Sequence, residues 1–299
     1  QYAMQIMFSM VMLAMMFIMV PRAQAAAVRI SEVLETVPEI TDAEETKDSV
    51  TAKGYVEFED VTFSYPGAEK PVLQNISFLA RPGEVTAIIG STGSGKSTLI
   101  NLIPRFYDVD SGRILIDGVD VREMSQEILR SKIGFVPQKA VLFSGSIADN
   151  IKFGNARATD EEVKHAAEVA QAAEFISNMA GGFNHVIAQG GTNVSGGQKQ
   201  RLAIARALVR KPEVYILDDS FSALDFKTDA RLRAALKKET TEATVIIVAQ
   251  RVGTVMDADR IIVLDEGRIA GMGTHRELLG TCGVYREIVS SQLSEEEIA

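Results

Sequence analysis

The sequence contains few of the residues that form metal clusters and covalent cross-links. Its 299 residues include one cysteine, Cys282, and no tryptophan. A single cysteine excludes a disulfide within the chain and a four-cysteine zinc site. The three histidines, His165, His185 and His275, lack the spacing of metal ligands, and no Ser/His/Asp set indicates a hydrolase triad.

Positive side chains are outnumbered, with 31 Lys and Arg against 40 Asp and Glu, and the formal net charge is −9. This balance argues against a general nucleic-acid-binding protein, whose surface is normally strongly basic, so we expect no nucleic-acid partner. Negative side chains are concentrated in residues 28–53, which we expect to form an acidic helical linker interrupted by Pro38, and in an acidic tail over residues 293–299. We interpret both segments as solvent-exposed.

The first twenty residues carry no charge at all and hold seven of the eleven methionines. An apolar helix of about 20 residues spans the hydrocarbon core of a bilayer. Because Pro21 and Arg22 follow the apolar run, we predict one transmembrane helix within residues 1–27, with the rest of the chain on the cytoplasmic side. The chain begins with Gln1 rather than Met, so we expect this helix to be the end of a transmembrane domain whose earlier helices precede it.

A secretory signal peptide is the alternative for this helix, since Ala23-Gln24-Ala25 resembles a cleavage site. The segment has no positively charged region before the apolar run, however. The nucleotide site predicted below also requires a domain that stays in the cytosol. We therefore favour the membrane helix.

Residues 54–292 alternate between apolar runs and helical patterns. The apolar runs lie at 85–89, 214–217 and 244–248, while Val56, Phe58 and Phe63 indicate a further strand. Helical patterns cover residues 160–177, 198–209 and 229–238. Continuous apolar strands are typical of a parallel sheet that is buried on both faces, so we predict an α/β domain.

A glycine-rich segment follows the strand at 85–89. It reads Gly90-Ser91-Thr92-Gly93-Ser94-Gly95-Lys96-Ser97 and continues with Thr98 into a helix, which matches the phosphate-loop pattern. Its glycines let backbone N–H groups converge on phosphate oxygens, and the helix N-terminus adds positive potential. Lys96 can reach the β- and γ-phosphates, while Ser97 and the strand-end Asp218 can hold Mg²⁺. The sequence therefore predicts a nucleoside triphosphate site.

A second short loop before a helix reads Ser195-Gly196-Gly197-Gln198 and is a second potential anion site. With the phosphate loop, it closely resembles the signature of an ATP-binding-cassette (ABC) domain, over about residues 54–290. The resemblance implies a P-loop NTPase-type α/β fold with a helical signature subdomain, in which the signature closes on ATP held by a partner's phosphate loop. Tyr65 resembles the aromatic residue that stacks on adenine, Gln138 the Q-loop glutamine near the metal and the attacking water, and residues 222–225 the D-loop.

The order of helix, linker and cassette resembles the C-terminal part of an exporter-type ABC subunit, in which membrane and ATPase domains are fused. Residues 142–147 also resemble that subfamily, where this region faces the coupling helices of the membrane domain. The resemblance implies an integral membrane protein with a cytoplasmic nucleotide-binding domain that couples hydrolysis of MgATP to efflux. Its implied partners are the lipid bilayer, a second ABC subunit and a transported substrate, which the sequence does not specify.

Three positions depart from the family pattern. Asp219 stands where a glutamate usually polarises the attacking water, Gln250 where a switch histidine is usual, and Gln189 where exporters commonly have a glutamate. An Asp carboxylate is set back by one C–C bond, about 1.5 Å, and misplacement on this scale can cost on the order of 10²-fold in rate. Gln250 can hydrogen-bond a γ-phosphate but carries no titratable proton. Lys96, Gln138, Asp219 and Gln250 are thus the catalytic candidates of a slow, degenerate site.

The signature itself is nearly intact, with Val194 before it where leucine is usual. We therefore hypothesise one half of a heterodimeric exporter, whose partner is a different ABC subunit with the catalytic glutamate and switch histidine intact. The alternatives are a homodimeric exporter that tolerates both substitutions, a soluble ABC ATPase acting in translation or DNA repair, and a membrane-anchored module that senses ATP without transport. The uncharged N-terminal helix and the lack of a basic face argue against the soluble ATPase.

Overall fold

Residues 1–41 form a unit of their own. In the computed structural model, which describes residues 1–47 and 53–293, this unit contains one helix, α1 (Tyr2–Leu34). The helix has 33 residues, none of them buried, and is long and apolar enough to cross a membrane. At 1.5 Å per residue it extends about 50 Å, against about 30 Å for the hydrocarbon core of a bilayer.

The structure corrects the expected linker. The N-terminal helix continues past residue 27, through Pro21, and ends at Leu34. Residues 35–47 contain no helix, so the expectation of a helical linker is wrong beyond Leu34. The physical reason lies in Pro38, which lacks an N–H and disfavours helical backbone at the residue before it. The rest of the linker, residues 48–52, and residues 294–299 of the acidic tail lie outside the described residues.

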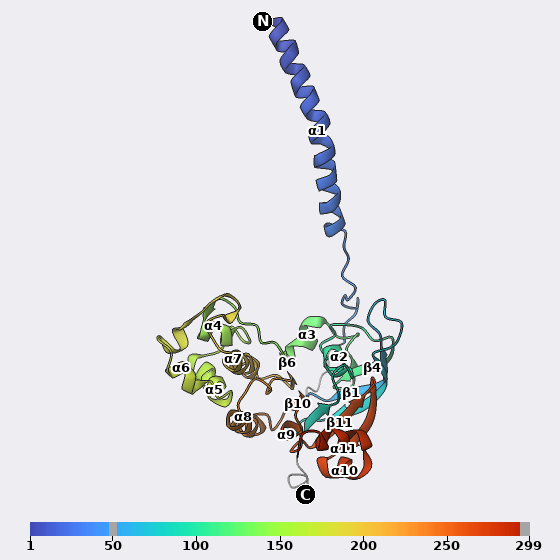
Figure 1. The fold of residues 1–299 in the computed structure, drawn as a ribbon, viewed down its shortest axis with the longest axis vertical. Coiled ribbons are helices and arrows are strands. Elements are labelled where there is room, and N and C mark those ends of the chain that lie inside the picture. The colour runs from blue at the N-terminus through green and yellow to red at the C-terminus, as the bar shows by residue number, and fades with distance from the viewer. Residues whose placement is uncertain (48–52, 294–299) are drawn as a thin grey trace. The chain divides into compact units, whose positions relative to one another are not determined.

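The second unit is built on a six-stranded sheet (Figure 1). Its strand order is β12-β11-β3-β10-β9-β6, and every neighbouring pair is parallel except β11 with β12. The strands are β3 (Val85–Ile89), β6 (Ile133–Val136), β9 (Val214–Asp218), β10 (Thr244–Val248), β11 (Arg260–Asp265) and β12 (Arg268–Gly273). The predicted α/β class is confirmed.

Both faces of this sheet are buried, because successive side chains of each strand enter different cores. On β10, Val245 and Ile247 join a core with α7 (Gly196–Leu208) and α8 (Phe226–Glu239). Ile246 and Val248 join a second core with α2 (Lys96–Leu102) and an antiparallel sheet. Because side chains on both faces of each strand are buried, the strands appear in the sequence as uninterrupted apolar runs.

The antiparallel sheet has the order β2-β1-β4-β5. Its strands are β1 (Val56–Phe63), β2 (Leu73–Ala80), β4 (Ser111–Ile116) and β5 (Val119–Asp120). In β1 the buried side chains are Val56 and Phe58, then Val61 and Phe63, so the alternation shifts by one residue between them. The register shifts there against both neighbouring strands, and Asp60 adopts a positive φ of 51°. This bulge explains how Val56 and Phe63, at positions of opposite parity, face the same core.

A helical subdomain packs into the first of the two cores, the one that contains α7 and α8. It contains α4 (Ile147–Lys152), α5 (Asp160–Val169) and α6 (Ala173–Ser177), the start of α7, the short strands β7 (Gly145–Ser146) and β8 (Val186–Ile187), and two 3₁₀ turns (Gly182–Asn184 and Gln189–Gly191). The single helix expected over residues 160–177 is therefore wrong. The chain breaks at Gln171, whose φ is 55°, so α5 and α6 run separately into the same core.

The remaining helices are α3 (Gln126–Ser131), α9 (Val252–Val255), α10 (His275–Thr281) and α11 (Gly283–Ser290). Where α3 ends, Lys132 forms a buried ion-pair cluster with Asp117 and Glu213, at 3.3 and 2.8 Å. One oxygen of Asp117 also accepts hydrogen bonds from the backbone N–H groups of residues 54 and 55. The cluster therefore joins the start of β1 to the start of β9.

Candidate nucleotide site

The phosphate loop connects β3 to α2 and is held in a tight curl. Gly93 and Gly95 have φ values of 84° and 99°, which favour glycine. A Cβ at Gly90 would lie 2.1 Å from the carbonyl oxygen of Leu264 in β11, so the loop packs directly on the sheet. Nζ of Lys96 donates to the carbonyl oxygens of Gly90 and Ser91, at 2.8 and 2.7 Å. The loop therefore has the curl that the sequence pattern predicts.

Gly95 and one further glycine, Gly267, fix the start of β2 against this loop. A Cβ at Gly95 would lie 2.8 Å from Cδ2 of Leu73, and one at Gly267, in the β11–β12 turn, would lie 2.2 Å from the carbonyl oxygen of Val72. The backbone N–H of Gln74 also donates to the carbonyl of Gly267 at 2.8 Å. Val72 consequently lines the site, which no signal in the sequence indicated.

The chain supplies oxygen atoms suited to a hard cation next to the loop. The hydroxyl of Ser97, in the first turn of α2, donates to Oδ1 of Asp218 at 3.3 Å. Burial raises the pKa of the Asp218 carboxyl and lowers the pKa of the Lys96 ammonium. Hydroxyl and carboxylate oxygens are the donors Mg²⁺ prefers, so these residues fit the ion, and its charge would offset the cost of burying Asp218.

Three strand ends bring three further side chains together. Gln138 follows β6, Asp219 follows β9 and Gln250 follows β10, and these strands are neighbours in the sheet. Oδ2 of Asp219 accepts one hydrogen bond from Nε2 of Gln138 at 3.3 Å and one from Nε2 of Gln250 at 3.1 Å. Asp219 is 8% exposed and has a positive φ of 43°. Two neutral amides thus hold the carboxylate that stands in the place of the usual glutamate.

These residues line one cavity of about 270 Å³. Its walls combine the phosphate loop with the strand ends and are formed by Val72, Thr92, Gly93, Gly95, Lys96, Ser97, Thr98, Gln138, Asp218, Asp219, Val248 and Gln250. The structure therefore brings together about half of the residues that the sequence predicts for nucleotide and metal binding, including all three metal candidates. Gly90, Ser91 and Ser94 form the back of the loop.

Tyr65 lies close to this cavity without lining it. Its hydroxyl and the hydroxyl of Thr98 form a 3.0 Å hydrogen bond. Its ring makes edge contacts with Phe63 and with Tyr107. Tyr107 is 37% exposed and was not predicted, because it lies outside every motif. Stacking of Tyr65 on adenine stays a prediction.

The signature loop stands apart from the cavity and is exposed. The Ser195 hydroxyl accepts from the backbone N–H of Gln198, whose side chain accepts from the N–H of Ser195, so the two form a capping box at the start of α7. Gly196 is exposed, and a Cβ at Gly197 would lie 3.0 Å from the carbonyl oxygen of Ala223 in the D-loop. The N-terminal end of α7 and the D-loop therefore form one surface.

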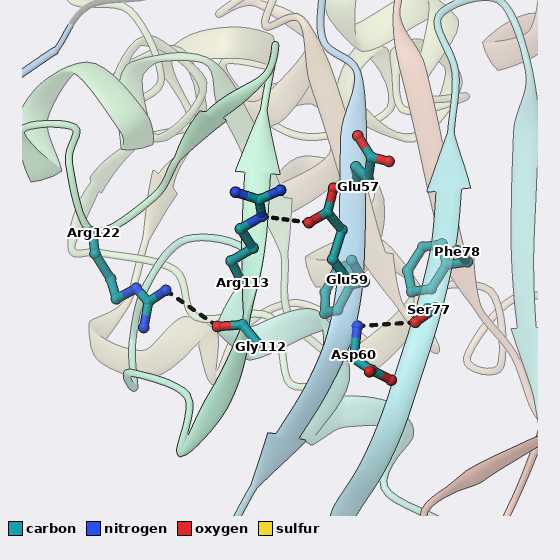
Figure 2. Close-up of a pocket in the computed structure, with 9 residues that line it drawn as sticks. Glu57, Glu59, Asp60, Ser77, Phe78, Gly112, Arg113 and Arg122 are labelled. Carbon is teal, nitrogen blue, oxygen red and sulfur yellow. Dashed lines mark hydrogen bonds and ion pairs between the residues drawn. The ribbon is translucent and has the colours of Figure 1, made fainter.

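A larger hollow, of about 760 Å³, lies on the antiparallel sheet, away from the phosphate loop (Figure 2). Both of its arginines are already paired with carboxylates: Arg113 pairs with Glu59, and Arg122 donates to Asp120 and to the carbonyl of Gly112. A polyanionic ligand would find no free cluster of positive charge among these residues. The smaller cavity at the phosphate loop is the better nucleotide site.

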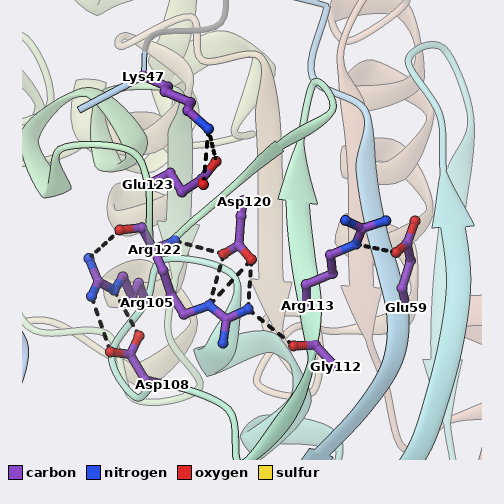
Figure 3. A network of polar contacts seen from close by, with 9 residues as sticks. All are labelled: Lys47, Glu59, Arg105, Asp108, Gly112, Arg113, Asp120, Arg122 and Glu123. Carbon is purple, nitrogen blue, oxygen red and sulfur yellow. Dashed lines mark hydrogen bonds and ion pairs between the residues drawn. The ribbon is translucent and has the colours of Figure 1, made fainter. Parts of the chain in front are cut away.

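The same network extends to the segment that precedes β1 (Figure 3). Lys47 pairs with Glu123 at 3.0 Å, and its backbone N–H donates to the carbonyl of Glu123. Arg105 pairs with Asp108 at 2.7 Å. The contacts of Lys47, together with a hydrogen bond from the backbone N–H of Gln126 to Asp42, attach residues 42–47 to the domain near α3.

Comparisons with known proteins agree with this arrangement. Residues 73–222 match the family model described as ABC transporter. An uncharacterized ABC transporter ATP-binding protein of Mycobacterium tuberculosis is 48% identical over 297 residues, which are 97% of this chain and 50% of the relative. An ATP-dependent lipid A-core flippase of Methylobacillus flagellatus is 42% identical over 269 residues, 90% of this chain and 46% of the relative. The chain spans about half the length of the curated relatives it matches.

Among solved structures, a bacterial Atm1-family ABC exporter with ATP bound has a similar fold. The TM-score is 0.89 and the sequences are 36% identical. The match covers 95% of this chain and 50% of the exporter chain.

Proposed function

The chain belongs to the ABC transporter family, and from this premise we propose that it is the ATP-binding subunit of an ABC exporter. The similarity to a lipid A-core flippase and to an Atm1-family exporter supports export as its role. In this proposal α1 lies in the bilayer and residues 54–292 form the cytoplasmic ATPase domain. Binding and hydrolysis of MgATP at a dimer interface drive efflux of the substrate.

The observation that carries the proposal is the cavity in which the phosphate loop meets Asp218. Backbone N–H groups of residues 90–97 bind the phosphates, and Lys96 turns from the loop carbonyls to the β- and γ-phosphates. Ser97, Asp218 and Gln138 would hold Mg²⁺, which would neutralise charge on the phosphates. Asp219, Gln138 and Gln250 surround the position of the attacking water.

We further propose that this site hydrolyses ATP slowly. Asp219 carries its carboxylate one C–C bond, about 1.5 Å, short of the usual glutamate. Its Oδ2 already accepts hydrogen bonds from two amides, and neither amide can exchange a proton at neutral pH. The shorter side chain weakens polarisation of a water molecule, and the amides that hold Asp219 in place cannot relay its proton. We therefore expect bound ATP to be hydrolysed slowly.

The exposed signature supports pairing with a second ABC subunit. Ser195 and Gly196 face solvent beside the D-loop, and none of the signature residues lines the chain's own cavity. In a head-to-tail dimer this loop completes the site of the partner. A partner with the glutamate and histidine intact would then hydrolyse ATP efficiently, which is the heterodimeric arrangement that we propose.

Nucleotide binding by the 299-residue chain in lipid nanodiscs tests the core of the proposal. We expect saturable binding of a fluorescent ATP analogue that requires Mg²⁺. Lys96→Ala should weaken it at least 10-fold, because a charged hydrogen bond is worth about 1.5–3 kcal/mol. Lys199→Ala is the matched control, since Nζ of Lys199 bonds the carbonyl of Gly190 beside the signature. Equal affinities of the two variants would contradict a nucleotide site at the phosphate loop.

A further inference from the structure

Gln292 follows α11 and makes two hydrogen bonds to the segment 250–252, which we name the switch segment. Its Oε1 accepts from the backbone N–H of Val252 at 2.9 Å. Its Nε2 donates to the carbonyl oxygen of Gln250 at 2.8 Å. The side chain of Gln292 therefore hydrogen-bonds the backbone on both sides of Arg251.

The contacts of α11 with the core fix the position of Gln292. Tyr285 and Val289 of α11 are completely buried, and the Tyr285 hydroxyl forms a 2.7 Å hydrogen bond with Nδ1 of His275. Leu293, the next residue after Gln292, packs against the same core. Because α11 is anchored by these contacts, Gln292 holds the switch segment against a rigid support.

The side chain of Val252 is completely buried in the core, but its backbone N–H depends on Gln292. Val252 provides the first N–H of α9, and Arg251 at the N-cap forms no side-chain cap, so without Gln292 this donor would depend on solvent. On its other side the segment faces the site: Gln250 donates to Asp219, and Arg251 donates to the carbonyl of Ser222 in the D-loop at 3.3 Å.

We propose that Gln292 is a positioning residue for hydrolysis, which keeps the side chain of Gln250 directed at Asp219 and the phosphate cavity. The proposal rests on the function proposed above. Gln292 acts through the backbone of the switch segment and does not contact the phosphate loop. Loss of Gln292 therefore lowers the rate of hydrolysis and spares the affinity for MgATP.

Three variants of the full chain in nanodiscs test this role. Gln292→Ala removes both hydrogen bonds, Gln292→Glu keeps the acceptor for Val252 but loses the donor to Gln250, and Ser291→Ala changes a neighbouring side chain that bonds only within α11. The measurements are amide hydrogen exchange over residues 249–255, affinity for a fluorescent ATP analogue with Mg²⁺, and single-turnover hydrolysis.

With Gln292→Ala we expect exchange at Val252 to rise about 5-fold, which corresponds to one lost hydrogen bond. Turnover should fall about 10-fold, because ångström-scale displacement of a catalytic group is costly, while the affinity changes less than 2-fold. Gln292→Glu should leave the exchange at Val252 close to that of the unchanged chain and still lower the turnover. Ser291→Ala should match the unchanged chain in all three measurements.

Unchanged exchange in Gln292→Ala would overturn the inference, and so would raised exchange with normal turnover. A parallel loss of affinity, turnover and thermal stability would also overturn it, since that pattern marks general support of the fold. Failure of the unchanged chain to bind MgATP would instead overturn the function proposed above. The exchange measurement separates the two, because it needs no hydrolysis.

Discussion

Restoring the usual residues at the two divergent positions should turn a slow site into a fast one. The perturbation is Asp219→Glu together with Gln250→His in the full chain. The added methylene advances the carboxylate by about 1.5 Å. The carboxylate also leaves the place where Nε2 of Gln138 and Nε2 of Gln250 now donate to Asp219, at 3.3 and 3.1 Å. The histidine adds a side chain that can be protonated near neutral pH.

The expected gain follows from these changes. Correcting an ångström-scale misplacement is worth on the order of 10²-fold, or about 2.7 kcal/mol of activation free energy. We expect phosphate release per chain to rise about 100-fold in the double variant at saturating MgATP, and by less in either single variant. The assay must cover a range of chain concentrations, because the signature completes a site only when two chains pair.

Mixing identifies which chain supplies which part. The double variant with Ser195→Arg added cannot complete a site for another copy of itself, so it should be inactive alone. The unmodified chain should restore its activity through its own signature, Ser195→Ala in that chain should reduce the effect, and Asp219→Asn should not. Brisk hydrolysis by the unmodified chain that Asp219→Asn abolishes would refute the reasoning, because the site would then be competent as it stands.

Three further changes have defined outcomes. Gly90→Ala should lower the free energy of unfolding, measured in denaturant, by about 3 kcal/mol, because its Cβ would lie 2.1 Å from a carbonyl oxygen. Gly93→Ala, whose Cβ would have nothing within 4 Å, should cost about 1–2 kcal/mol of backbone strain. Equal costs of the two variants would contradict the close packing of the loop. Asp218→Asn should raise the midpoint of thermal unfolding of the nucleotide-free chain at neutral pH, because burial raises the pKa of this carboxyl and its charged form, dominant above that pKa, opposes folding. The same variant should abolish Mg²⁺-dependent nucleotide binding. A lower midpoint would contradict the stability prediction. Lys132→Ala should cost about 3–5 kcal/mol, because it leaves a buried carboxylate without its cation, while Lys152→Ala, which breaks an exposed pair, should cost less than about 1 kcal/mol.

Features that depend on neighbouring residues along the chain could be predicted from the sequence. The strands at Val85–Ile89 and Thr244–Val248 have the expected bounds, because fully buried strands leave uninterrupted apolar runs. The phosphate loop is equally local, since its glycines and the following helix are contiguous. Parallel strands then bring Gln138, Asp218 and Gln250 to one edge of the sheet, as their positions after predicted strands suggest.

Features that depend on packing between distant segments could not be predicted. The break at Gln171 carries no proline or glycine and follows from the fit of two helices into one core. The bulge at Asp60 is set by the partners of β1 on both sides. Gln292 contacts a segment about forty residues away in the sequence and belongs to no motif, and the bonds from two amides to Asp219 join three separate strand ends.

The close packing of Gly95 and Gly267 on the start of β2 limits which parts of the domain can be displaced separately. Gly95 and Gly267 hold Val72 and Leu73 so closely that no side chain fits between them. The antiparallel sheet and the phosphate loop are therefore joined by close packing, and a displacement of one would displace the other. The chain passes between the sheet and the helical subdomain at two crossings, one after β6 and one before β9, and a displacement of the subdomain would have to be taken up there. Gln138 lies on the first of these crossings and donates to Asp219, so a change at this crossing would be transmitted directly to the nucleotide cavity.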